Sequence, residues 1–262
     1  MYGCNGDTPM PTGPATALPF GVLSEEPTDN TLPFATLVTQ SEPNGFTYTT
    51  LNDSALIVHI PATFTPSIIA SPEKGISPRQ ALEEHNLKIV VGSGYATSAT
   101  SLQPIGLLKL NGQEVSPLEP LGYTRIVGFM QDTSEADQPL RVVHRNQLPE
   151  GLFSDAMQVG PGIIEAGVLD ISEKDLLRQK YFRSFVALCT NETLLGVTTT
   201  PMHLRTLGEQ LVALFESKRM PCTEVINFAG DRQAALAFTD DTGRTYFHGD
   251  PEAARVTLLG FR

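Results

Sequence analysis

The stretch at 223–238, TEVINFAGDRQAALAF, predicts a strand, a sharp break and a second strand. The apolar residues of the first run are Val225, Ile226 and Phe228, and those of the second run include Leu236 and Phe238. Between them Asp231 and Arg232 place opposite charges side by side, directly after a buried strand. A turn that only reverses the chain needs no more than an Asn-Gly or Asp-Gly pair. The charged loop is therefore a candidate functional element.

Length and composition describe an ordinary globular chain. It has 262 residues, of which 40% are hydrophobic and 18% are charged, which is enough to bury a sizeable core. The formal net charge of -11 disfavours nucleic acid and anionic lipid as partners, because both repel an acidic surface. No apolar run approaches the length of a membrane span, so no transmembrane segment is expected. Oligomeric state is not indicated.

Turn residues and alternating apolar runs favour sheets over a helical bundle. The chain has 22 glycines and 20 prolines, and the alternation begins near Phe34. Asn111 and Gly112 supply the pair of positive φ angles that a type I′ hairpin needs. The expected fold class is α+β, with mixed, largely antiparallel curved sheets and about three helices packed on them.

Three helices are expected from their sequence patterns, at about 78–86, 172–182 and 206–219. Ser77 caps the first, and Thr206 with Glu209 has the spacing of a capping box at the start of the third. Residues 1–33 are rich in Pro, Gly, Thr and acidic residues, and we expect them to form a flexible N-terminal tail. Residues 34–262 are expected to form one domain.

The three cysteines are sparse and odd in number, so they do not indicate a disulfide framework. Cys189 and Cys222 can form a bridge if their strands are neighbours, but the sequence favours buried free thiols. Cys4 follows Met-Tyr-Gly, which is similar to the end of a lipoprotein cleavage box. Export or attachment to the cell envelope and a loose cytosolic tail both fit this context, and no signal peptide is visible in this chain.

Several familiar chemistries have no support in the sequence. Gly92 and Gly94 follow an apolar run, but Thr97 stands where a dinucleotide-binding loop needs its third glycine. The five histidines lack the paired spacing of metal ligands, and no Gly-x-Ser-x-Gly elbow indicates acyl-enzyme chemistry. We therefore expect neither a cofactor nor a metal.

Arg183 stands at the head of a strongly apolar strand, RSFVALC. A guanidinium is costly in that position unless something anionic pairs with it. Two explanations are open. One is an internal ion pair with Asp231, and the other is a site that receives an anionic ligand.

Six segments occur in an order that resembles the phosphodiester glycosidase family, to which the lysosomal uncovering enzyme belongs. The likeness covers about residues 76–239, and 34–262 is interpreted as a divergent domain of this kind. The segments are ISPRQALEEHNLKIVVGSGYATS at 76–98, PIGLLKLNGQEVSPL at 104–118, AMQVGPGIIEAG at 156–167, RSFVALCTNETLLGVTTT at 183–200, TLGEQLVALFES at 206–217 and VINFAGDRQAAL at 225–236. Relatives of this kind commonly work outside the cytoplasm or in the envelope.

The resemblance implies a site and also shows where this chain departs from the family. The positions that match the family motifs are Gly94, Tyr95, Gly160, Pro161, Arg183, Asn227 and Gly230. Gly92 replaces the family's loop asparagine, Ser93 a glycine, and Ala229 its aspartate. Asp231 and Arg232 replace two further glycines.

Cleavage of a sugar from a phosphate makes particular demands on a site. The phosphate leaving group is a weak base, so protonating it matters less than in ordinary glycoside hydrolysis. A cation must hold the phosphate, and a carboxylate must activate water or stabilise positive charge at the anomeric carbon. Arg183 and Asp231 are the predicted catalytic residues in these two roles. Ser93, Gly94, Tyr95, Gly160, Asn227, Gly230 and Arg232 are predicted to bind a small anionic sugar or glycan.

Two further interpretations stay open. With Gly92 and Ala229 in place of the family's polar residues, the scaffold can instead be a catalytically inactive carbohydrate-binding module, a pseudoenzyme. It can also be an interaction module with no small ligand. The environment of Arg183 distinguishes them, because a structural arginine has all its donors satisfied internally.

Overall fold

The computed structural model describes residues 31–33, 46–97, 101–130, 140–171, 179–240 and 243–262. Three sheets dominate it, and they are antiparallel except where β1 (Thr31–Pro33) runs parallel to β17 (Thr245–His248). Of the predicted tail at 1–33, residues 31–33 form β1 and residues 1–30 lie outside the described residues. The start of the expected domain at 34–45 also lies outside them.

The seven-stranded sheet carries much of the candidate site. Its strands, in order across the sheet, are β12 (Val168–Leu169), β11 (Gly162–Glu165), β15 (Cys222–Gly230), β13 (Arg183–Cys189), β14 (Glu192–Thr198), β3 (Ala55–Pro61) and β2 (Thr47–Leu51). Every residue of β13 is buried, because this central strand is covered on both faces.

The other two sheets pack against it. The six-stranded sheet has the order β1, β17, β16 (Leu236–Thr239), β5 (Ile89–Gly92), β18 (Thr257–Phe261) and β4 (Pro66–Ala70). The five-stranded sheet has the order β7 (Gln113–Ser116), β6 (Leu108–Leu110), β10 (Asp155–Val159), β8 (Arg125–Phe129) and β9 (Leu140–His144). The main core lies between the sheets and takes residues from all three, among them Val186, Val91 and Val127.

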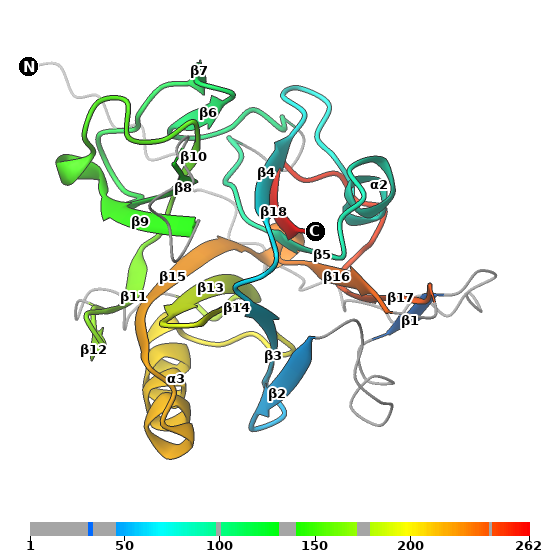
Figure 1. Cartoon of the computed structure of the whole chain (residues 1–262), viewed down its shortest axis with the longest axis vertical. Helices are drawn as coiled ribbons and strands as arrows, with labels where there is room; N and C mark the ends of the chain where they lie inside the picture. Colours follow the sequence, from blue (N-terminus) through cyan, green and yellow to red (C-terminus); the bar gives the residue numbers. More distant parts are fainter. Residues whose placement is uncertain (1–30, 34–45, 98–100, 131–139, 172–178, 241–242) are drawn as a thin grey trace, which may run out of the picture.

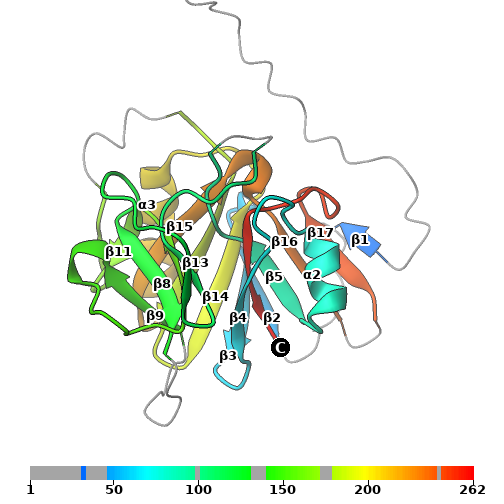
Figure 2. The ribbon, with the colours of Figure 1, turned by 90° about the horizontal axis from the view of Figure 1, so that it is seen from above.

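The expectation of about three helices is wrong for the described part of the chain, which has two α-helices. These are α2 (Pro78–Glu84) beside the six-stranded sheet and α3 (Leu204–Lys218) on the outer face of the seven-stranded sheet (Figures 1 and 2). Of the third segment, 172–178 lies outside the described residues. Its end is not helical, because Tyr181 forms an antiparallel bridge with Met202.

Two of the local predictions are confirmed. Ser77 caps α2, with its hydroxyl accepting a hydrogen bond from the backbone N–H of Gln80 at 3.1 Å. Asn111 and Gly112 have φ angles of 51° and 79° in the turn between β6 and β7, as a type I′ hairpin requires.

The capping box predicted at Thr206 and Glu209 is wrong. Helix α3 begins at Leu204, with His203 at the N-cap position and no side-chain cap. Glu209 instead accepts a hydrogen bond at 2.8 Å from Nε of Arg205, one turn earlier on the helix surface.

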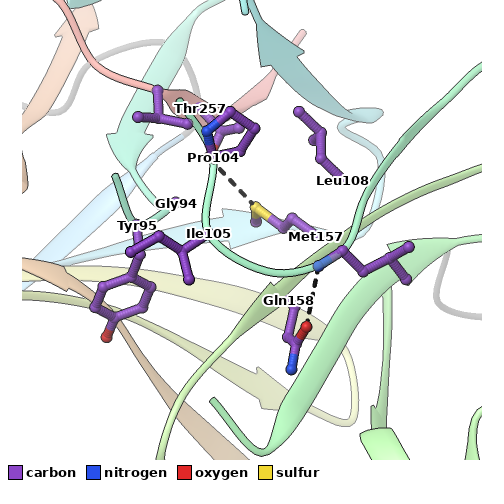
Figure 3. A pocket seen from close by; sticks show the side chains of 10 residues that line it. Gly94, Tyr95, Pro104, Ile105, Leu108, Met157, Gln158 and Thr257 are labelled. Carbon is purple, nitrogen blue, oxygen red and sulfur yellow. Dashed lines mark hydrogen bonds between the residues drawn. The ribbon is translucent and has the colours of Figure 1, made fainter. Parts of the chain in front are cut away.

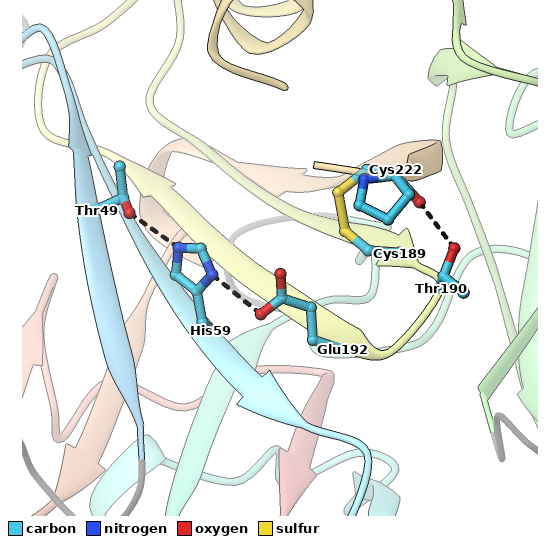
Figure 4. Close-up of a disulfide and its surroundings, with 7 residues drawn as sticks. Thr49, His59, Cys189, Thr190, Glu192 and Cys222 are labelled. Carbon is cyan, nitrogen blue, oxygen red and sulfur yellow. Dashed lines mark hydrogen bonds and ion pairs between the residues drawn. A yellow bond between two sulfur atoms is a disulfide. The ribbon is translucent and has the colours of Figure 1, made fainter. Parts of the chain in front are cut away.

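Cys189 and Cys222 form a disulfide, so the expectation of free thiols is wrong for this pair. The two residues lie directly opposite each other on β13 and β15 (Figure 4). The sequence left this bridge open because pairing of β13 with β15 was not known.

Within the described ranges, no helix is long and apolar enough to cross a membrane.

Candidate functional site

Several predicted site residues meet where β13 begins and β15 ends. Arg183 is the first residue of β13 and lies opposite Gly230, the last residue of β15. The loops that follow β5 and β10 reach the same place, since the hydroxyl of Tyr95 lies 2.7 Å from the carbonyl oxygen of Gly160 and 2.7 Å from that of Phe228. The seven-stranded sheet thus supplies two strand ends, and the six-stranded and five-stranded sheets each supply one loop.

Arg183 is buried, with 6% of its surface exposed. Its Nε donates to the carbonyl of Met202 at 3.2 Å, and one terminal nitrogen donates to Oδ1 of Asn227 at 3.2 Å. The guanidinium also lies 5.6 Å from the centre of the half-exposed Tyr181 ring, within the range of a cation–π interaction. Arg183 is therefore fixed by its own chain, yet it stays next to the 229–233 turn.

Asn227 connects Arg183 to Tyr95. Its amide Nδ2 donates to the hydroxyl oxygen of Tyr95 at 2.8 Å and to the carbonyl of Phe228 at 2.6 Å. The backbone on both sides is tied to the Gly160–Pro161 segment, where N–H of Gly160 donates to Asn227 at 3.0 Å. The structure thus brings Tyr95, Gly160, Arg183 and Asn227 together in one polar network.

Ser93 and Gly94 lie against Thr257 on β18 instead of the Arg183 network. The Ser93 hydroxyl lies 3.1 Å from the hydroxyl of Thr257 on β18. Gly94 approaches the same residue so closely that a Cβ there would lie 2.0 Å from Oγ1 of Thr257, which explains the glycine. The pocket beside Gly94 and Tyr95 (Figure 3) has a volume of about 10 Å³, or room for about one water molecule.

The two positions that depart most from the family motif are adjacent in space. The hydroxyl of Ser184 lies 2.6 Å from the carbonyl oxygen of Gly92 and 2.9 Å from that of Ala229. A Cβ at position 92 would lie 1.9 Å from the carbonyl oxygen of Gln233. The turn after β15 therefore occupies the space that a side chain at position 92 would need.

Asp231 opens that turn with a left-handed backbone, φ 51°. Its N–H donates to the carbonyl of Phe182 at 2.9 Å. The residue is exposed overall, but partial burial of its carboxyl group raises the pKa, while a hydrogen bond from the Phe182 backbone and the charge of Arg183 lower it. Asp231 and Arg183 thus interact electrostatically, and the next residue, Arg232, is exposed.

Gly230 lets the turn fold back on the chain before β13. A Cβ there would lie 2.8 Å from the carbonyl oxygen of Phe182.

His248 lies beside the same segment, with its ring centre 6.4 Å from that of Phe182. Burial lowers the pKa of His248, and a hydrogen bond to the backbone of Thr198 opposes the change. Sequence reasoning did not single out His248, because a lone histidine in a predicted hairpin forms no recognisable motif.

Gln158 is an organising residue that sequence reasoning missed, although it lies in the quoted 156–167 segment. It is 1% exposed, and its amide makes four hydrogen bonds. Its Oε1 accepts from the backbone N–H of Leu107 at 3.0 Å and of Glu119 at 2.8 Å, and its Nε2 donates to the carbonyls of Glu119 and Tyr123, both at 2.8 Å. Gln158 thereby holds the 117–123 loop, whose Tyr123 ring lies 4.3 Å from that of Tyr95.

Comparisons with known proteins place the fold. No family model and no curated protein matches this sequence. The structure is similar to that of the catalytic domain of zebrafish N-acetylglucosamine-1-phosphodiester α-N-acetylglucosaminidase, with a TM-score of 0.59 over 84% of this chain and 83% of that chain, at 14% identity. A hypothetical protein from Synechocystis is also similar, with a TM-score of 0.53 over 82% of this chain and 61% of that chain, at 12% identity.

These similarities show a distant relationship of fold. At 14% identity they do not show membership of a family, and they carry no activity to this chain. The chemistry has to be argued from the residues at the site.

Proposed function

We propose that this chain binds a sugar-1-phosphodiester, or a related anionic glycan, where β13 begins and β15 ends, and that Asp231 activates the water that attacks the anomeric carbon. The observation that carries the proposal is the convergence of Arg183, Asn227, Tyr95 and Asp231 at one place. The fold relationship to a glycosidase of N-acetylglucosamine-1-phosphodiesters supports it.

The two arginine side chains, Arg232 and Arg183, have separate roles in this proposal. Arg232 is exposed and makes the first contact with the phosphate. Arg183 contributes its charge from below the surface, held in place by Asn227 and the Met202 carbonyl. A fixed positive charge in a partly desolvated place stabilises a leaving phosphate more than a mobile surface charge does.

Asp231 supplies the carboxylate that position 229 lacks. The raised pKa of Asp231 makes its carboxylate a better base for activating water than an ordinary aspartate. No protonation of the phosphate is required, because it is already a good leaving group. In this proposal Tyr95 orients the amide of Asn227 through the 2.8 Å contact.

A second candidate function is binding without turnover. It is favoured by the closure around Gly92, where the Gln233 carbonyl fills the space of the family's asparagine, and by the small volume of the pocket beside Tyr95. In this case the same cations recognise the phosphate, and Asp231 only shapes the turn.

The test uses the methyl phosphodiester of N-acetylglucosamine 1-phosphate with the full chain. Release of free sugar and calorimetric binding are measured for the parent, Asp231→Asn, Arg232→Gln and the matched control Asp53→Asn. Asp53 is also exposed with a left-handed backbone, φ 56°, at the β2–β3 turn, and asparagine accepts that conformation.

Turnover in the parent and in Asp53→Asn, with a loss of at least about 100-fold in Asp231→Asn, supports hydrolysis. Binding without sugar release, weakened in Arg232→Gln, supports the second candidate. An inert parent that does not bind the diester overturns both.

A further inference from the structure

A second polar group lies at the other end of the β13–β14 hairpin, on the seven-stranded sheet. His59 on β3 stands between Thr49 on β2 and Glu192 on β14 (Figure 4). The Thr49 hydroxyl lies 2.9 Å from Nε2 of His59, and Nδ1 of His59 lies 3.1 Å from Oε2 of Glu192. Since β13 has seven residues, this group is roughly 20 Å along the strand from Arg183.

The hydrogen-bond chemistry fixes the direction of the chain. An ionised Glu192 carboxylate only accepts hydrogen bonds, so Nδ1 of His59 carries the proton that is donated to it. In the neutral imidazole Nε2 is then the acceptor, and the Thr49 hydroxyl donates to it. A hydroxyl, an imidazole and a carboxylate in this order, with both contacts near 3 Å, form the arrangement that activates a nucleophile.

The group is both held and accessible. The His59 side chain is 15% exposed and that of Glu192 is 30% exposed. Glu192 follows the two-residue turn after Cys189, whose disulfide ties the end of β13 to β15 (Figure 4). The carboxylate therefore sits next to a covalently fixed point, and β-sheet backbone carries all three side chains.

We propose that Thr49, His59 and Glu192 form a second, hydrolytic site that accepts small esters. Oγ1 of Thr49 attacks the carbonyl carbon while its proton passes to Nε2 of His59. The tetrahedral adduct collapses to an acyl-threonine, and the leaving alkoxide takes the proton from Nε2. Water then attacks the acyl group with His59 as base, and the carboxylic acid leaves as Thr49 regains its proton. Glu192 keeps the imidazole in the required tautomer throughout.

The site escaped sequence reasoning because it forms no local motif. Thr49 and His59 are 10 residues apart, and Glu192 is 133 residues further along the chain. Only the register of β2, β3 and β14 brings them together.

The test treats the full chain with a fluorophosphonate probe and, separately, with p-nitrophenyl acetate. The variants are Thr49→Val, His59→Gln and Glu192→Gln. Thr50→Val is the matched control, because Thr50 is an exposed threonine on the opposite face of the same strand. Valine keeps the β-branched shape that suits a strand.

The expected result is probe attached to the peptide that contains Thr49, with labelling and ester hydrolysis lost in Thr49→Val and His59→Gln. Glu192→Gln lowers the rate at least about tenfold, and Thr50→Val matches the parent. A parent that takes no probe, takes it elsewhere, or hydrolyses the ester no faster than Thr49→Val overturns the proposal. Probe mapping on the parent decides the matter even if a variant fails to fold. The Asp231→Asn variant keeps this activity, so the two proposals fail independently.

Discussion

Removal of the Cys189–Cys222 disulfide is expected to destabilise the fold substantially. The bridge closes a loop with a sequence separation of 33 residues. The loop-closure entropy lost by the unfolded chain is then about 12.5 cal/mol/K, which corresponds to about 3.7 kcal/mol at 25 °C. For a protein of this size that free energy lowers Tm by roughly 7–15 °C.

Urea denaturation of the parent and of Cys189→Ala/Cys222→Ala measures the effect, with a reductant added in a second series. The parent in reductant should approach the double variant, because both lack the cross-link. Cys4→Ala is the control, and it should leave the free energy of unfolding unchanged. A double variant within about 1 kcal/mol of the parent would refute the assignment of the disulfide as a major constraint on the unfolded state.

Three other changes have defined outcomes. Gln158→Leu removes the side-chain partner of one buried and three partly buried backbone groups, so it should lower the free energy of unfolding by at least about 2 kcal/mol in urea denaturation. Burial of Glu224 is the main reason why the pKa of its carboxyl group is raised in the folded state. The native state therefore binds more protons than the unfolded state near pH 4.5, stability falls as pH rises through this range, and Glu224→Gln should flatten the fall in Tm. Gly92→Asn places a side chain against the Gln233 carbonyl, so it should lower diester binding in calorimetry rather than restore activity.

The sequence predicted the local structure where one short signal decides the conformation. Ser77 before Pro78 marks the start of α2, and Asn111-Gly112 marks a hairpin, because each signal involves only neighbouring residues. The start of α3 was misplaced, since Thr206 and Glu209 have capping spacing but lie inside the helix. Tertiary packing of Leu204 and Leu207 extends the helix two residues beyond that signal.

Contacts between distant segments could not be predicted in the same way. The bond between Ser184 and the Gly92 carbonyl spans 92 residues, and the one between Asn227 and Tyr95 spans 132. The sequence pointed to Arg183, Asn227 and Tyr95 through a resemblance, but nothing in it gave the pairing of β13 with β15 that sets their separation. For the same reason the disulfide was left as the less favoured alternative, and the Thr49–His59–Glu192 group was missed.

The departures at Gly92 and in the 229–233 turn are best understood as one rearrangement. Without a Cβ at position 92, the Gln233 carbonyl can approach to a distance that any other residue would forbid. That approach gives the turn its course, with Asp231 in the left-handed region and bonded to Phe182. A side chain at position 92 would push the turn away and with it the carboxylate next to Arg183. The glycine at position 92 and the position of Asp231 are thus linked by sterics, because the close approach of the Gln233 carbonyl to Gly92 sets the course of the turn that carries Asp231.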